Sequence, residues 1–229
     1  GVRRFSAYVI RIMNDKKLIC VKAQSLEYYR AESILTPHCF TTRLGGVSSG
    51  YLDSLNLGIH RGDKPENVLK NYEILGNALG FAVQNTVLSK QTHSDVVRNV
   101  GSTEWGAGLF APELAPCDAL ITSQPGTALV VFTADCTPVL LWDCVTGAVG
   151  AVHAGWRGTS ADIAGKTVKA MEEAFGCNPA NICAAIGPNI GKCCFEVEHD
   201  VADVFLYGNF VQIGISRKNR RIKRRDGMS

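Results

Sequence analysis

The segment 128–158 constrains the fold most, because short apolar runs alternate there with turn residues. The runs are rich in Val and Leu, and they predict three buried strands that lie side by side, at residues 128–134, 138–143 and 148–153. Reactive side chains stand at the ends of these strands, since Asp135 and Cys136 follow the first strand and His153 closes the third. Strand ends that present a thiol and an imidazole indicate a functional site as well as a core.

Outside this segment, similar patterns predict the remaining elements. Apolar runs predict strands at residues 39–42, 117–122 and 182–186, and a hairpin of 8–12 with 18–21. Helical spacing of apolar residues predicts helices at residues 63–80, 161–175 and 198–207. Asp63 is the expected N-cap of the first helix, and Thr159 or Ser160 caps the second. Strands that alternate with few helices favour an α/β (α+β) layered fold, with helices packed on a mixed sheet in a single domain over residues 1–229.

The charge of the chain is unevenly distributed. The formal net charge is +3, but the run 217–225 carries seven of the 24 basic residues. The rest of the chain has 17 basic and 21 acidic residues, so its formal charge is negative. A basic surface that binds nucleic acid normally has aromatic residues among its charges, and this run has none. We therefore expect a solvated basic tail at residues 217–229 and do not expect nucleic acid as a partner.

The cysteines and the apolar runs indicate the compartment. Nine cysteines are an odd number, and no N-terminal signal pattern precedes them, so we expect reduced thiols in a cytoplasmic protein. The adjacent Cys193 and Cys194 suit neither a relaxed disulfide nor a usual zinc site, and we interpret them as buried thiols. No apolar run reaches the roughly 18 residues of a membrane-spanning helix, so we expect a soluble protein that does not bind a membrane.

Two loops combine an arginine with glycines, which is a pattern suited to binding anions. Arg43 precedes a pair of glycines, and Arg157 lies between two glycines just before a predicted helix, whose amides and macrodipole favour an anion. An ordinary turn with a surface arginine explains each pattern equally well. His93 lies on a connection between two predicted strands, where a lone histidine is more often a hydrogen-bonded surface residue than a ligand.

Five segments in the same order resemble the laccase-domain family, namely TTRLGGVSSGYLDSLNLG (41–58), KQTHSDVV (90–97), TADCTPVLL (133–141), AVHAGWRGT (151–159) and AAIGPNIGKCCFEV (184–197). Members of this family have been called multicopper polyphenol oxidases. They are described as zinc-containing purine nucleoside phosphorylases with adenosine deaminase and methylthioadenosine phosphorylase activity. The resemblance covers about residues 36–205, and beyond them only residues 224–227 resemble the usual ending of the family.

This resemblance implies a zinc ion held by His93, Cys136 and His153. Two imidazoles and a thiolate leave the fourth corner of a tetrahedron open, as in catalytic zinc sites. The implied enzyme cleaves adenosine, inosine, guanosine or methylthioadenosine with phosphate and deaminates adenosine as a side activity. Beside the three zinc ligands, the candidate site residues are Asp135 for catalytic proton transfer and Arg43, Asn56, His60 and Arg157 for binding nucleoside and phosphate. We expect a monomer or a small homo-oligomer.

Two alternative functions use the same residues. The first is a copper-dependent polyphenol oxidase, but multicopper centres need many histidines in pairs such as His-X-His, and the chain has five histidines and no such pair. The second is a metal-free cysteine hydrolase in which Cys136 is the nucleophile and His153 its base. A metal assay separates the second alternative from the zinc enzyme.

Overall fold

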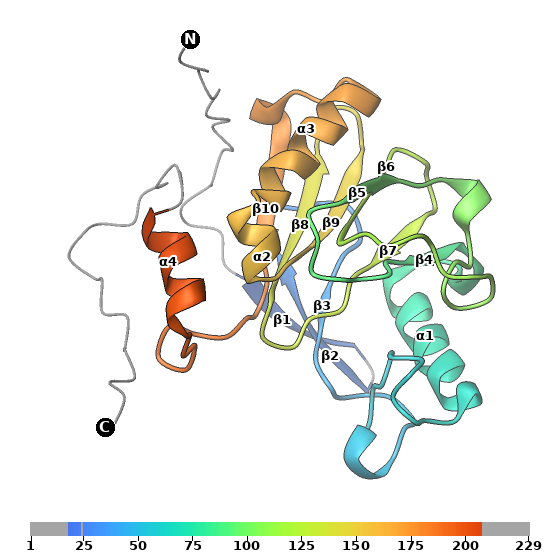
Figure 1. Ribbon diagram of the computed structural model, residues 1–229. Helices are drawn as coiled ribbons and strands as arrows, with labels where there is room; N and C mark the ends of the chain where they lie inside the picture. Colours follow the sequence, from blue (N-terminus) through green and yellow to red (C-terminus); the bar gives the residue numbers. More distant parts are fainter. Residues whose placement is uncertain (1–17, 24, 208–229) are drawn as a thin grey trace, which may run out of the picture.

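The computed structural model of the chain describes residues 18–23 and 25–207, which form layers around one central sheet (Figure 1). This sheet has the strand order β10-β8-β9-β6-β5. In chain order the strands are β5 (Val97–Asn99), β6 (Ala119–Thr122), β8 (Thr137–Asp143), β9 (Val149–Ala154) and β10 (Ile182–Ile186). β5 and β6 pair in parallel and the other neighbours are antiparallel, so the sheet is mixed, as predicted.

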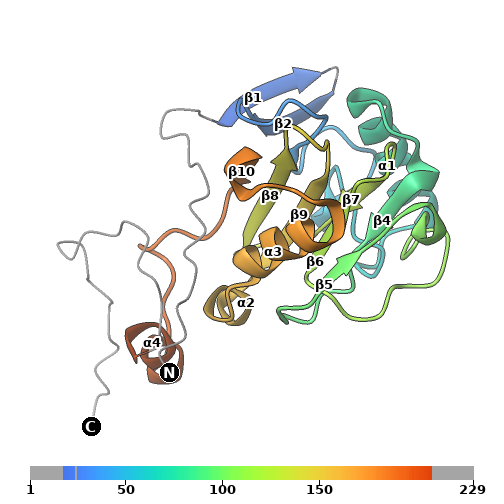
Figure 2. The same ribbon diagram turned by 90° about the horizontal axis from the view of Figure 1, so that it is seen from above.

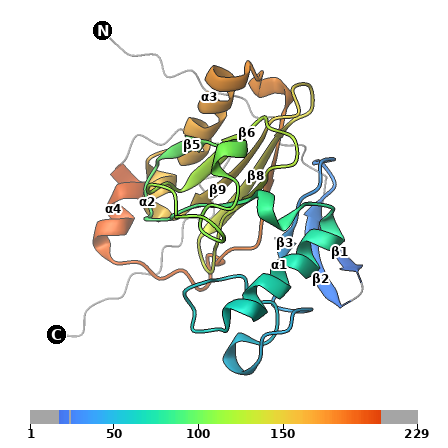
Figure 3. The same ribbon diagram turned by 90° about the vertical axis from the view of Figure 1, so that its right-hand side faces the viewer.

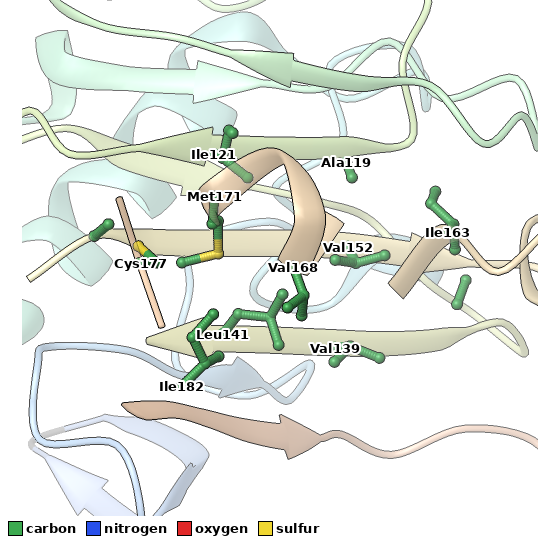
Figure 4. Packing of buried hydrophobic residues seen from close by; sticks show 12 residues of the cluster. Ala119, Ile121, Val139, Leu141, Val152, Ile163, Val168, Met171, Cys177 and Ile182 are labelled. Carbon is green, nitrogen blue, oxygen red and sulfur yellow. The ribbon is translucent and has the colours of Figure 1, made fainter. Parts of the chain in front are cut away.

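One face of the central sheet is covered by the helix α3 (Ile163–Phe175) (Figure 2). Alternate residues of a strand point to the same face, and on this face Val139, Leu141 and Val152 pack against the helix. Val168 and Met171 of α3 point onto these strands (Figure 4). The helix therefore forms the main core of the domain with β6, β8 and β9.

The start of this helix differs from the prediction. The chain first makes a short helix, α2 (Trp156–Ser160), and α3 begins only after Asp162. Asp162 has a left-handed backbone with φ of 58°, and its side chain accepts the Gly165 N–H, which makes it the N-cap. The predicted caps Thr159 and Ser160 were wrong because both belong to the last turn of α2.

The other face of the central sheet packs against smaller units (Figure 3). They contain β1 (Leu18–Ala23), β2 (Leu26–Ala31), β3 (Phe40–Thr41), α1 (Pro65–Leu79), β4 (Thr86–Leu88) and β7 (Ala128–Val130). Phe40 packs near Leu140 and Ala185 of the central sheet, and Val87 packs near Leu120. The remaining elements are α4 (His199–Tyr207) and the 3-10 helices η1 (Gly50–Leu52), η2 (Val83–Asn85), η3 (Ser102–Glu104) and η4 (Pro179–Asn181).

The first of the three predicted strands in the segment 128–158 is shorter than expected and lies in another sheet. β7 ends at Val130 and pairs in parallel with β4, whereas β8 and β9 do pair with each other as predicted. The Gln91 side chain explains the early end. Its amide donates to the Phe132 carbonyl at 2.7 Å and accepts the Phe132 N–H at 2.7 Å, so it occupies the backbone groups that a neighbouring strand would use.

Three further interpretations need correction. The expected N-cap Asp63 was wrong, because the N-cap of α1 is Lys64 and no side chain caps this helix. β1 pairs with β2, a strand that the sequence reading missed, and the predicted partner at residues 8–12 lies outside the described residues, as does the basic run 217–225. Cys193 and Cys194 are exposed, not buried, and their sulfur atoms lie 3.2 Å apart. They lie in the segment that follows β10 and precedes α4.

The layered α/β fold with a mixed sheet is confirmed, and so are the helices predicted near α1, α3 and α4. Whether residues 1–229 act as one domain stays a prediction. Among the described helices, none combines the length and the apolar composition that crossing a membrane requires.

Candidate metal centre and active site

The pairing of β8 with β9 brings a cysteine and a histidine together. Pro138 faces His153 across the ladder and Thr137 faces Ala154, so Cys136 lies just before β8, beside the end of β9. Because strand side chains alternate, Cys136 and His153 point to the face opposite α3. The predicted juxtaposition of these two residues therefore follows from the register of one hairpin.

His93 reaches the same place from the loop between β4 and β5. The ligand atoms of His93, Cys136 and His153 all lie within 4.8 Å of one another, and the two imidazole rings meet edge to face with centroids 4.9 Å apart. Zinc bonds of about 2.0–2.3 Å in a tetrahedron place ligand atoms roughly 3.3–3.8 Å apart. A small inward movement of the side chains is enough for the three residues to hold one metal ion.

Gly155, immediately after β9, leaves the space in which this cluster forms. A Cβ atom at this position would lie 2.9 Å from Cδ2 of His93 and 3.3 Å from Sγ of Cys136. Any side chain larger than that of glycine would push one of the ligands away. The first glycine of the GWRG segment thus serves the cluster, and the donor set and the space both fit a metal ion.

Asp118 is the residue at this site that the sequence reading missed. It precedes β6, has no exposed side-chain surface, and accepts hydrogen bonds from the ring of His153 and from the loop that carries His93. A signal was present in the sequence, because Asp118 is a charged residue inside the otherwise apolar run 117–121. Burial alone would raise its pKa, but hydrogen bonds from Ser94, His153 and the Thr92 amide together hold the pKa below its usual value.

The Cys136 thiol is not activated by its protein surroundings alone. Burial, followed by the Asp135 and Asp118 carboxylates, raises its pKa. Without a cation the thiol therefore stays protonated near neutral pH, which disfavours a free cysteine nucleophile. A divalent cation reverses this preference because a thiol that binds a metal is deprotonated.

A cavity of about 1470 Å³ opens onto the cluster. It lies over the face of the sheet opposite α3 and includes Asp135 beside the three candidate ligands. Its apolar lining residues include Phe40, Leu57, Leu129, Val130 and Phe132. Its polar lining residues include Asn56, His60, Arg61, Ser89, Lys90, Gln91 and Glu113. A mostly apolar space with several polar groups, next to a candidate metal site, is typical of a small-molecule site.

The sequence matches the family described as multi-copper polyphenol oxidoreductase laccase over residues 37–224. The chain belongs to this family. A protein of Deinococcus radiodurans named purine nucleoside phosphorylase is 39% identical over 198 residues, which are 86% of this chain and 74% of that protein. The purine nucleoside phosphorylase YlmD of Bacillus subtilis is 37% identical over 166 residues, and the match spans only 60% of its length.

Solved structures show the same likeness. The crystal structure of YlmD from Geobacillus stearothermophilus has a TM-score of 0.76 with this chain at 33% identity, and the match covers 83% of this chain and 72% of that one. A Bacillus licheniformis protein, YfiH, has a TM-score of 0.74 at 32% identity, with 87% and 74% covered. The laccase-domain fold is therefore shared beyond the sequence motifs.

The two arginines in the family motifs do not line the cavity. The Arg43 guanidinium is exposed and donates to the Asp53 carbonyl at 2.7 Å. Arg157 is also exposed, and its guanidinium lies over the Trp156 ring, 4.2 Å from the centroid. The anion site at the helix start stays a prediction, although the Thr159 amide already donates to the Gly155 carbonyl within the five-residue α2.

Asn56 and His60, the other two predicted binding residues, do line the cavity. Asn56 is held in place because its side chain donates to Asp63 at 3.0 Å. His60 is exposed and lies 3.4 Å from Glu113, which also contacts Lys90 at 2.8 Å. Two basic residues that the sequence reading did not single out, Arg61 and Lys90, also line the cavity.

Proposed function

We propose that this chain is a zinc-dependent purine nucleoside phosphorylase. It cleaves adenosine, inosine, guanosine or methylthioadenosine with phosphate, giving the free base and the sugar 1-phosphate, and it deaminates adenosine as a side activity. The observation that carries the proposal is the convergence of His93, Cys136 and His153 at one end of the cavity. Relatives named purine nucleoside phosphorylase support the substrate class.

The three convergent side chains are the proposed zinc ligands. Two imidazoles and one thiolate suit zinc and leave one coordination position for substrate or water, which is the arrangement of a catalytic site. When bound, zinc supplies a Lewis acid at this end of the cavity. Copper is the alternative metal, in keeping with the description of the family, but the chain has five histidines and a multicopper centre needs more.

The apolar and polar residues that line the cavity suit the two substrates. In phosphorolysis a phosphate oxygen bonds to the anomeric carbon while the bond from that carbon to the purine nitrogen breaks and its electron pair goes to the base. The apolar side chains, such as Phe132 and Leu129, accept the planar purine. The basic side chains of His60, Arg61 and Lys90 attract the phosphate. Holding both reactants in one cavity supplies the orientation that such a displacement needs.

Proton transfer to the departing base is assigned to Asp135. Its carboxyl group is exposed, lines the cavity and is adjacent to Cys136 in the chain. The position of its backbone is fixed, because the Asp135 carbonyl accepts the Ile190 N–H at 3.0 Å. A carboxyl group held beside the candidate metal ligands can exchange a proton with a substrate that fills the cavity.

Product analysis tests the proposal. Purified protein of known zinc content is incubated with adenosine or inosine, with and without phosphate. We expect the free base and ribose 1-phosphate only when phosphate is present, and we expect inosine from adenosine in both conditions. A protein that holds about one zinc per chain and yet releases neither base nor inosine would exclude the proposed activity.

A cysteine hydrolase is the second candidate, because one geometric observation favours it. His153 contacts the Asp118 carboxylate at 2.7 Å and lies beside Cys136, so the three residues form a thiol, imidazole and carboxylate series. The raised pKa of Cys136 opposes this function. Chelation separates the two functions. A chelator abolishes the activity of a zinc enzyme, whereas a cysteine hydrolase keeps its activity in the chelator and loses it when the Cys136 thiol is alkylated.

A further inference from the structure

Asp118 occupies an unusual position for a carboxylate. It is fully buried just before β6, and its backbone is fixed by the sheet, because the Asp118 carbonyl accepts the His153 N–H at 2.7 Å. A buried carboxylate is costly unless its oxygens are fully hydrogen-bonded. The groups that donate to this carboxylate therefore indicate which parts of the structure it positions.

Five donors point at this side chain, and all belong to His153 or to the loop that carries His93. Oδ1 accepts from the His153 ring at 2.7 Å and from the His93 amide at 3.0 Å. Oδ2 accepts from the Thr92 amide at 3.1 Å, and from the amide and the hydroxyl of Ser94, both at 2.7 Å. A single carboxylate thus joins two candidate metal ligands that are distant in sequence.

We propose that Asp118 is a positioning residue that forms the metal site before the metal binds. It sets the tautomer of His153 and the backbone conformation of His93. Both ligands are hydrogen-bonded to the same oxygen atom, Oδ1 of Asp118. The inference rests on the metal site of the proposed function and does not depend on the nucleoside chemistry.

The tautomer follows from hydrogen-bonding capacity. An ionised carboxylate can only accept, so Nδ1 of His153 must carry the proton that bridges the 2.7 Å contact. Nε2 is then unprotonated, and its lone pair is free for the metal. Carboxylates commonly orient metal-binding histidines in this way and raise their basicity.

The loop conformation follows from three consecutive amides. His93 has φ of 59°, a left-handed backbone that is unfavourable for a residue with a side chain. This conformation turns the amides of Thr92, His93 and Ser94 toward one point, as in a backbone anion-binding nest. The Asp118 carboxylate fills that nest, so it holds the strained residue in the conformation that directs the His93 ring to Cys136 and His153.

The variant Asp118→Asn tests this inference because it keeps the shape and removes one acceptor. In one orientation the side-chain oxygen of the new asparagine takes the place of Oδ1, and its NH₂ group then faces the N–H groups of Thr92 and Ser94. Two donors face each other, so the loop loses these hydrogen bonds. In the flipped orientation the NH₂ group faces the His153 ring, which must then change its tautomer to accept a hydrogen bond. Either result disorders one ligand, so we expect zinc affinity, measured by competition with a chromogenic chelator, to fall about 10-fold to 100-fold.

Two variants serve as matched controls. Asp143→Asn removes another fully buried carboxylate of the same sheet, which accepts the Val145 and Thr146 amides and touches no candidate ligand. It should lower the melting temperature and leave zinc affinity unchanged. Ser94→Ala removes only one of the five donors and should reduce zinc affinity less than Asp118→Asn does. Equal zinc affinity in Asp118→Asn and wild type would overturn the inference.

A measurement on the wild-type protein covers the case in which Asp118→Asn does not fold. Nitrogen chemical shifts of the metal-free protein report which ring nitrogen of His153 is protonated. We expect the proton on Nδ1, and a proton on Nε2 would refute the assigned geometry. A wild-type protein that binds no zinc would instead contradict the proposed function, so the two failures are distinguishable.

Discussion

The two faces of the central sheet use the same strands for different purposes. On the face toward α3, Val139, Leu141 and Val152 are nearly inaccessible to solvent and belong to one apolar cluster. On the opposite face, His153 near the end of β9 and Cys136 just before β8 border a cavity. The strand alternation therefore separates the residues of the core from the candidate metal ligands.

This separation depends on register. A shift of one residue in the pairing of β8 with β9 would exchange the two faces and bury the reactive side chains under α3. The alternating apolar positions prevent such a shift, because they would lose their contacts with Val168 and Met171. The core thus determines the positions of the candidate ligands through the strand register. Substitutions on the cavity face should mainly change metal binding, and substitutions on the core face should mainly change stability.

The largest expected effect comes from the cavity face. Cys136→Ala removes one of the three proposed ligands, so we expect loss of the bound zinc and a fall in phosphorolysis to the background rate. The melting temperature of the metal-free protein should change little, because Cys136 is only half-buried. Cys144→Ala, at an exposed cysteine just after β8, is the control and should retain both zinc and activity. Full activity in Cys136→Ala would exclude the metal centre.

The core face should show the opposite result. Leu141→Ala leaves a cavity under α3, because the Leu141 side chain is 2% exposed. We expect the free energy of unfolding to fall by about 2–5 kcal/mol. Zinc stoichiometry of the folded fraction should be unchanged. Urea unfolding and a zinc assay on the same sample measure both quantities, and a loss of zinc from still-folded protein would show that the two faces are not independent.

Local patterns predicted much of this fold. The spacing of Val68, Tyr72 and Leu75 indicated α1, and short apolar runs indicated β8, β9 and β10. Two of the failures arose where a side chain replaced a backbone interaction. Gln91 ends β7 early, and Asp162 starts α3 late, and neither effect is visible in hydrophobic periodicity.

The candidate site was predicted in part for a similar reason. The family motifs indicated His93, Cys136 and His153, and the structure brings these three together. The assignment of Arg43 and Arg157 to an anion site stays a prediction, because local glycine patterns do not determine where a guanidinium points. Asp118 was overlooked because its partners, His93 and His153, are 25 and 35 residues away in the chain.

A smaller effect should follow from Gly155→Ala. The backbone φ of Gly155 is −69°, which any residue adopts, so the consequence is purely steric. The new methyl group would meet the His93 ring and the Cys136 sulfur. We expect zinc affinity to fall by about 10-fold with little change in stability. Gly101→Ala, where nothing lies within 4 Å of the added atom, is the control. Unchanged zinc affinity in Gly155→Ala would show that the cluster has more room than the structure indicates.

The smallest expected effect is a pH-dependent change in stability from Asp63, which lies just before α1. Hydrogen bonds from Ser48, Asn67 and Asn56, and one from the Lys64 amide, lower the pKa of Asp63 to about 2. The unfolded chain has a pKa of about 3.9 for the same group. Stability contributed by the ionised form is therefore present above about pH 4 and is lost as the pH falls toward 2. Wild type should melt above Asp63→Asn near neutral pH, and the difference should shrink between about pH 4 and 2. A difference in melting temperature that stays constant down to pH 2 would contradict this assignment. It would show that the ionised Asp63 carboxylate is not the source of the stability.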